Sequence, residues 1–77
     1  MITVRLFAGA AEAAGAQELT LAASSVEGLR EALARRGDDA PRVIRQCAIL
    51  RDGTRLEDHE ALVGGDLVDV LPPFAGG

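Results

Sequence analysis

Hydrophobic and polar residues alternate near both ends of the chain. Close to the first residue, Ile2, Val4 and Leu6 fall on one face of an extended segment, and residues 67–71 alternate in the same way. A period of two is typical of a strand that buries one of its faces. The pattern therefore predicts a first strand over residues 2–8 and a last strand over residues 67–71.

Two further strands and a hairpin are predicted in the body of the chain. Residues 17–22 alternate again, with leucines on the inward face. Residues 46–51 form another apolar segment, which leads into the dipeptide Asp52-Gly53. This dipeptide is a strong signal for a two-residue hairpin turn, so a short return strand that ends at Leu56 is predicted to follow it.

One helix is predicted between the second and third strands. Ser24 and Glu27 have the spacing of a capping box, in which each side chain satisfies a free amide of the first turn. The apolar residues that follow recur at spacings of three and four, which gives one buried stripe. The pattern predicts a helix over residues 25–36, with Gly37 just after its end.

Three segments lack either period. Residues 8–16 are small and include two glycines, so they are predicted to form a loop with one helical turn. Residues 38–42 are predicted to be a polar connector. Residues 57–66 are predicted to run over the surface, with Leu62 as an inward anchor.

The order of these elements predicts the fold class. Two strands, a crossover helix and further strands in 77 residues match an α+β, β-grasp (ubiquitin-like) architecture. We expect a mixed sheet of four to five strands with one main helix, and the first and last strands side by side in its middle. Residues 1–72 would form this domain, and residues 73–77 a flexible tail.

Charge and composition narrow the class of function. Twelve acidic and eight basic residues give a formal net charge of −4. This charge disfavours a nucleic-acid partner, because phosphate binding needs an excess of clustered basic side chains. No run approaches the roughly 18 apolar residues of a membrane span, and the first residues lack the pattern of a signal peptide. We therefore expect a soluble, cytoplasmic protein that binds neither nucleic acid nor a membrane.

The few reactive side chains argue against a pocket enzyme. One cysteine and one histidine can form neither an internal disulfide nor a four-ligand zinc site, so no metal site is expected. Cys47 is predicted to be a small buried core residue, and His59 to lie in a solvated surface turn. Any chemistry is therefore expected to use an unusual reactive group.

An apolar patch is predicted on the sheet face opposite the helix. If the first and last strands are neighbours, Phe7, Leu67 and Leu71 point to this face, with Arg5 and Arg55 at its rim. Such a patch on a small domain typically marks a partner surface. The alternative interpretation is a set of scattered exposed apolar side chains, which are common on protein surfaces.

The last residues of the sequence have an unusual composition. The apolar final strand is followed by two prolines, Phe74, Ala75 and the pair Gly76-Gly77. Glycine has no side chain, so this pair can enter a slot too narrow for other residues. The six residues beyond Leu71 span roughly 20 Å when extended. The segment could therefore present a terminal carboxylate inside the active site of another protein.

The segment LPPFAGG on a β-grasp pattern resembles the MoaD/ThiS family of ubiquitin-like sulfur carriers, and within it most closely the small subunit of molybdopterin synthase. The resemblance covers the whole chain, through MITVRLFAGAAEAAG, SVEGLREALARRG and GGDLVDVLPPFAGG. The final segment is its most diagnostic part.

The resemblance implies a carrier mechanism rather than a free-standing enzyme. An E1-like enzyme would adenylate the carboxylate of Gly77 with ATP and magnesium, and sulfur from a sulfurtransferase or persulfide would convert it to a thiocarboxylate. The large subunit of molybdopterin synthase would receive this group within a heterotetramer. No cofactor would be bound by the chain itself. The partner-binding residues implied in this way are Gly76, Phe74, Leu71, Leu67, Phe7 and Arg5.

Three alternatives stay open from the sequence. The chain could carry sulfur for another pathway, such as thiamine, tRNA thiolation, cysteine or a secondary metabolite. It could be a ubiquitin-like modifier whose Gly77 is joined to a lysine of a target protein. It could also be an interaction module whose last residues are inert.

Overall fold

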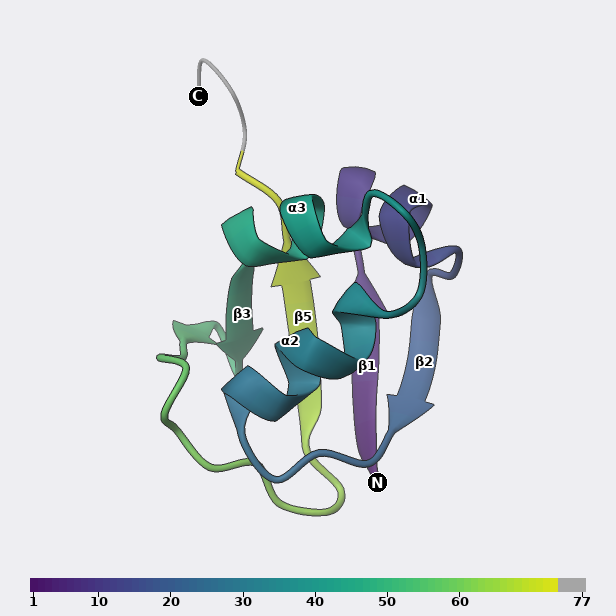
Figure 1. Ribbon diagram of the computed structural model, residues 1–77. Coiled ribbons are helices and arrows are strands. Elements are labelled where there is room, and N and C mark those ends of the chain that lie inside the picture. The colour runs from purple at the N-terminus through teal and green to yellow at the C-terminus, as the bar shows by residue number, and fades with distance from the viewer. Residues whose placement is uncertain (74–77) are drawn as a thin grey trace.

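The computed structural model describes residues 1–73, which fold around one mixed sheet (Figure 1). Its strands are β1 (Ile2–Leu6), β2 (Glu18–Leu21), β3 (Ala48–Arg51), β4 (Thr54–Arg55) and β5 (Leu67–Leu71). Their order is β2-β1-β5-β3-β4. β1 and β5 are parallel neighbours at the centre, and the other pairs are antiparallel. The predicted β-grasp arrangement, with the first and last strands adjacent, is therefore confirmed.

The strand boundaries lie close to the predicted ones. β5 occupies the predicted residues, whereas β1 ends before the predicted limit because the chain turns at Ala8, whose φ is positive. β3 begins at Ala48 rather than at Gln46, since Gln46 still belongs to a helix. Asp52 and Gly53 have φ values of 54° and 77°. Two positive φ values are what a type I′ hairpin turn requires, so the predicted turn is confirmed.

The main helix, α2 (Val26–Ala34), is shorter than predicted and has a different cap. Ser25, and not Ser24, is its N-cap residue, and its hydroxyl accepts a hydrogen bond from the amide of Gly28 at 3.1 Å. The predicted capping box is therefore wrong by one residue. The helix ends at Ala34, and Arg35 occupies the C-cap position. The predicted apolar stripe is buried, because it faces the sheet.

Two short helices, α1 (Gly9–Ala14) and α3 (Ala40–Gln46), occupy segments predicted to be mostly irregular. α1 exceeds the single predicted turn, and α3 replaces the predicted connector. Pro41 does not prevent α3, because it stands in the first turn, where the missing N–H is not needed. Ile44 of α3 is buried in the core. Each helix contributes apolar side chains to the core, and this burial stabilises helices that are too short to form alone.

The turn after α2 packs against α1. Arg36 Nε donates a hydrogen bond to the carbonyl oxygen of Ala14 at 2.9 Å. A Cβ atom on Gly37 would stand 2.7 Å from the carbonyl oxygen of Ala13. Gly37 is therefore required for this close approach, and it does not have the left-handed conformation of the predicted helix-ending residue.

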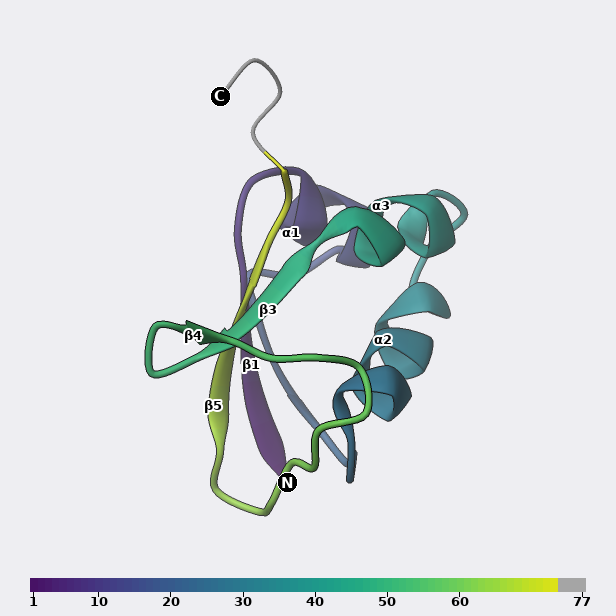
Figure 2. The ribbon, with the colours of Figure 1, turned by 90° about the vertical axis from the view of Figure 1, so that its left-hand side faces the viewer.

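The core lies between the sheet and the helices. Figure 2 shows α2 and α3 on one side of the sheet, with its other face uncovered. Cys47 is 1% exposed, as predicted, although it caps α3 rather than lying in a strand, and its Sγ donates to the carbonyl of Val43. Burial raises the pKa of this thiol. The largest fully buried side chains are those of Ile2, Leu29, Leu33, Ile44, Ile49, Val4, Val26, Val68 and Val70.

The connection between β4 and β5 is fixed by one buried side chain and by hydrogen bonds next to the start of β5. Leu62 is buried, so the predicted inward anchor is confirmed. Asp66 accepts a hydrogen bond from the amide of Val63 at 3.0 Å and another from Arg51 at 2.9 Å. The amide of Val63 and, secondarily, the guanidinium of Arg51 lower the pKa of Asp66 against the opposing effect of desolvation. These bonds fix the turn that starts β5.

Because Asp66 has a lowered pKa in the folded protein, Asp66→Asn should change how stability depends on pH. The stabilisation from Asp66 is fully present above the pKa of an unfolded aspartate, about 4, and is lost as the pH falls through the lower folded value. Urea unfolding of the wild type and of Asp66→Asn is measured between pH 2 and pH 7. The difference between their midpoint urea concentrations should become smaller below pH 4. Asp38→Asn, at an exposed position, is the control. A difference that stays constant with pH would contradict the assignment.

Candidate functional site

The uncovered face of the sheet carries the outward side chains of β1 and β5. In the parallel register Thr3 lies opposite Leu67 and Arg5 lies opposite Asp69. The amide of Phe7 donates to the carbonyl of Val70 at 3.2 Å, which continues the ladder beyond β1. Alternate residues of a strand point to the same face. The structure therefore places Phe7, Leu67 and Leu71 on one face, as the alternation predicted.

This face does not hold one continuous apolar patch. Arg5 and Asp69 stand between its apolar residues and form a two-bond ion pair, with Nε–Oδ1 at 2.7 Å and the second N–O distance at 3.1 Å. Phe7 and Leu67, which are 40% and 43% exposed, lie on either side of this pair along the strands. The predicted position of Arg5 at the rim is therefore wrong, because the register of β1 and β5 puts it at the centre.

The ion pair also affects the pKa of Arg5. The hydrogen bonds and the charge of Asp69, with a small contribution from Glu18, raise the pKa of Arg5 above its usual value. Glu18 lies directly opposite Arg5 in the antiparallel register of β1 and β2. Arg5 is thus flanked by a carboxylate on each neighbouring strand.

A groove, here called the tail groove, lies where β5 ends, and Ala48, Leu50 and Leu71 supply apolar surface to it. β3 contributes Ala48, which lies opposite Leu71 of β5. The tail groove has a volume of about 450 Å³ and continues along Pro72 and Pro73, with Arg55 at its side. Its apolar floor therefore begins where the chain leaves the sheet.

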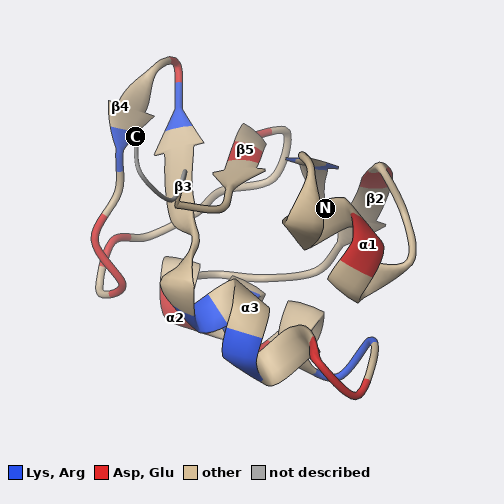
Figure 3. Cartoon of the chain, turned by 90° about the horizontal axis from the view of Figure 1, so that it is seen from above, with Lys and Arg blue, Asp and Glu red and all other residues tan. Residues whose placement is uncertain are grey.

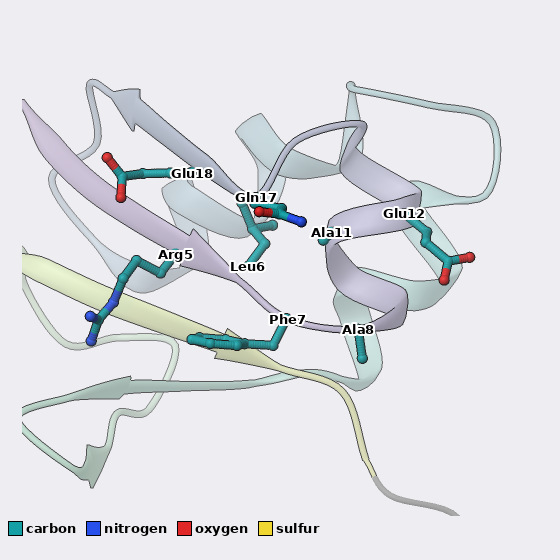
Figure 4. A pocket seen from close by; sticks show the side chains of 8 residues that line it. All are labelled: Arg5, Leu6, Phe7, Ala8, Ala11, Glu12, Gln17 and Glu18. Atoms are coloured by element: carbon teal, nitrogen blue, oxygen red, sulfur yellow. The ribbon is translucent and has the colours of Figure 1, made fainter.

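A second groove, here called the acidic groove, lies at the other side of Phe7 (Figure 4). It has a volume of about 630 Å³, and Phe7, Ala8 and Ala11 supply apolar surface to it. Glu12 of α1 and Glu18 of β2 supply its carboxylates, and Arg5, whose charge is paired with Asp69, also lines it. The groove therefore combines apolar contacts with negative charge.

The turn between β1 and α1, at the edge of the acidic groove, contains a strained residue. Ala8 has φ 49° and ψ −127°, a conformation that is accessible to glycine and unfavourable for a residue with a Cβ atom. The amides of Ala11 and Glu12 donate to the carbonyl of Ala8 at 3.0 and 3.2 Å, which fixes this conformation. Strain of this kind costs about 1–3 kcal/mol, and here it directs the chain from β1 into α1.

Ala8→Gly should therefore stabilise the protein by about 1 kcal/mol, because relief of the strain exceeds the added entropy of the unfolded chain. Ala11→Gly, inside α1, should destabilise it by about 1 kcal/mol. Urea unfolding of the two variants checks both signs. A destabilised Ala8→Gly protein would show that the Ala8 conformation is not strained.

Three predicted site residues, Phe74, Gly76 and Gly77, lie outside the described residues. Sequence reasoning also missed the contribution of β3 to the exposed face. Ala48 and Leu50 alternate with the buried Ile49, and this alternation is the signal that could have identified them. Pairing with β5 then brings them beside Leu71 and Asp69.

The candidate metal ligands of residues 1–73 include His59 and the acidic side chains. His59 is exposed in a turn, as predicted. Within this part of the chain, no three His, Cys, Asp or Glu side chains gather closely enough to hold a metal ion. The described helices are too short or too polar to cross a membrane.

Comparison with known proteins gives a consistent result. The model of the ThiS family matches residues 4–77. The structure is similar to that of SAMP1 from Haloferax volcanii, with 27% identity, a TM-score of 0.79 and coverage of 99% of this chain and 98% of that one. It is also similar to a protein described as molybdopterin converting factor, subunit 1, from Pyrococcus furiosus, with 25% identity, a TM-score of 0.77 and coverages of 95% and 97%.

A third similar structure is a complex of subunits 1 and 2 of molybdopterin-converting factor from Helicobacter pylori. Its identity is 23%, its TM-score 0.69, and the match covers 99% of this chain and 97% of that one. At this identity the likeness shows the fold. No curated protein matches the chain significantly in sequence.

Proposed function

This chain belongs to the ThiS family, and we propose that it is a sulfur carrier that works through the carboxylate of Gly77. The observation that carries the proposal is the family match, which extends through the final Gly76-Gly77. The uncovered sheet face and the tail groove add to it, because they provide a docking surface next to the segment that would enter a partner. Arg5, Phe7, Leu67 and Leu71 would belong to this surface.

The chemistry needs activation of Gly77 by a partner. The carboxylate attacks the α-phosphorus of ATP in an E1-like enzyme, with magnesium on the phosphates, and pyrophosphate leaves. The acyl adenylate then has AMP as a good leaving group. The terminal sulfur of a persulfide on a sulfurtransferase attacks the carbonyl carbon and displaces AMP. A second thiol cleaves the resulting S–S bond, which yields the thiocarboxylate and a protein disulfide.

The side chains of residues 1–73 supply none of these reacting groups in the proposal. Cys47 is buried and its pKa is raised, so its thiol is held in the unreactive neutral form. Phe74 would contact the partner, and Gly76 would pass through the narrow entrance to its active site. Because adenylation consumes ATP, the proposal places the protein in the cytoplasm.

For the pathway, we propose the small subunit of molybdopterin synthase. The similar structure from Pyrococcus furiosus is named as subunit 1 of molybdopterin converting factor, and the one from Helicobacter pylori as a complex that contains subunit 1. In the Helicobacter structure this subunit is in complex with subunit 2. By analogy, this chain would bind a large subunit, and we propose a heterotetramer with two copies of each. Sulfur transfer for another biosynthetic pathway is the alternative within the same chemistry.

A second candidate function is protein modification. Its support is the likeness to two structures of small archaeal modifier protein 1 (SAMP1) of Haloferax volcanii. In this case the adenylated Gly77 would be joined to a lysine of a target protein. The eight basic residues of this chain are all arginines, so any lysine joined to Gly77 would necessarily belong to another protein.

Intact mass spectrometry tests the proposal. The full chain is co-expressed with the E1-like enzyme of its own organism and a sulfur source, and a gain of about 16 Da is expected as oxygen is replaced by sulfur. An unchanged mass would contradict the carrier function. Recovery of other proteins whose lysines carry the tryptic peptide of residues 56–77, which follows the last arginine of the chain, would favour the modifier. Co-purification with a large molybdopterin synthase subunit would support the proposed pathway.

A further inference from the structure

A row of charged side chains, here called the charged row, crosses the uncovered face from one sheet edge to the other. The strand registers align its members: Glu18 lies opposite Arg5, Arg5 opposite Asp69, Asp69 opposite Leu50, and Leu50 opposite Arg55. The charged row thus contains one residue from each strand. Leu50 is its one apolar member.

The charges of the row are arranged asymmetrically. Arg5 and Asp69 neutralise each other at its centre through two hydrogen bonds. Glu18 and Arg55, at its two ends, are exposed, and neither forms an ion pair within the part of the chain that the structure describes. Four strand spacings separate these ends, roughly 19 Å. The row therefore has a negative end on β2 and a positive end on β4.

Each end borders one of the two grooves. Seen from above, β2 and α1 carry acidic residues at one end of the sheet, and β4 carries a basic residue at the other (Figure 3). Glu18 lines the acidic groove at the sheet and Glu12 lines it at α1, on the opposite side, and its apolar contacts come from Phe7 and Ala11. Such a groove suits a lysine or arginine, because these side chains carry a charge on an apolar stem. Arg55 stands at the tail groove beside Leu71 and offers a cation to a carboxylate.

We propose that the charged row determines which protein surface docks on this face and in which orientation. This inference rests on the proposed function, and it names the chemistry of the docking partner. The partner presents a basic side chain to the acidic groove at Glu18 and a carboxylate to Arg55. Apolar side chains of the partner cover Phe7 and Leu71.

The need for orientation follows from the position of the last residues. Apolar contacts are non-directional. The apolar side chains of the face would therefore bind a partner in more than one orientation. Only one orientation lines up the segment that leaves the sheet at Pro72 with an active site. A partner rotated by half a turn would place its basic group against Arg55 and its acidic group against Glu18. Repulsion between like charges disfavours this arrangement.

The central ion pair lowers the desolvation cost of covering this face with a partner. A charge that loses water without a partner is costly, whereas a charge that is already paired and hydrogen-bonded is far less so. Arg5 and Asp69 satisfy each other before any partner arrives. The middle of the face can therefore be covered without an additional charged group from the partner.

Charge reversal at the two ends tests this inference. Binding of the full chain to the purified E1-like enzyme is measured with a biosensor at several salt concentrations. Glu18→Arg and Arg55→Glu are each expected to weaken binding about tenfold and to reduce its salt dependence. The double variant, in which the row is reversed, should bind more weakly than either single variant.

Matched controls carry the same charge changes on the helical side. Glu31→Arg and Arg35→Glu are exposed on and just after α2, and they should change affinity by less than about twofold at moderate salt. Equal effects of control and test variants would overturn the inference, because net charge alone would then explain them. A wild-type chain that neither binds the enzyme nor gains mass would instead contradict the proposed function. Circular dichroism verifies that all variants are folded.

Discussion

Deletion of Gly77 should abolish sulfur transfer and leave the fold intact. The shortened chain ends about 3.5 Å earlier, so its new carboxylate cannot reach the position where the activating enzyme aligns it with ATP. Misplacement by 1 Å can cost a factor of about 100 in rate, and we expect no more than about 1% of the wild-type thiocarboxylate. Intact mass after co-expression measures this directly.

The same variant separates docking from chemistry. Every core residue lies between Ile2 and Val70, so the urea midpoint of the deletion variant should equal that of the wild type. Its affinity for the E1-like enzyme should fall only slightly, because the uncovered sheet face is unchanged. A deletion variant that still gains the mass of sulfur would show that Gly77 is not the carrier residue.

Leu29→Ala should have the largest effect on stability. Leu29 is fully buried where α2 faces the sheet, and replacement of such a residue by alanine typically costs 2–5 kcal/mol because a cavity remains. A domain of 77 residues has a total stability of roughly 4–12 kcal/mol. The substitution should therefore remove a large part of it.

A matched leucine on the exposed face is the control. Leu67 is 43% exposed, and Leu67→Ala should cost less than about 1 kcal/mol. Urea or thermal unfolding of the two variants at pH 7 gives the comparison. Equal losses would mean that the stabilising core does not lie between α2 and the sheet.

The parts of the fold that were predictable from sequence depend on local patterns. Alternation alone located β5, and the dipeptide Asp52-Gly53 has the positive φ values that its composition predicted. The helical cap was less certain because two serines are adjacent. Ser25 rather than Ser24 caps α2, and its backbone also pairs with Ala61, a residue far along the chain. That contact is not visible in the local sequence.

The two short helices were not predicted in full, again because contacts with distant residues are not visible in the local sequence. α3 begins next to a proline and has a charged surface, so its sequence looks like a connector. It is stabilised by Ile44, which packs in the core, and by Arg30, which donates to the carbonyl of Ile44 at 2.7 Å. Tertiary packing thus decides whether a segment of this length is helical.

The candidate site also has a part that was predictable from sequence and a part that was not. Alternation in β1 and β5 placed Phe7, Leu67 and Leu71 on one face, since side-chain direction within a strand depends only on the position of each residue. It could not place Arg5 against Asp69, because that contact depends on the register between strands 64 residues apart. The same register turns a predicted rim residue into the centre of the face.

By itself, the sequence determined the fold class, the outward direction of the residues of β1 and β5 and the unusual final Gly76-Gly77. These features follow from short-range rules: the period of a strand or helix, the backbone freedom of glycine and the turn preference of Asp-Gly. Only the tertiary structure decided that the charged row crosses all five strands, that its ends have opposite charge, and that a groove lies at each end. These features depend on pairing between distant strands, which comes from burial of the whole core rather than from any local segment.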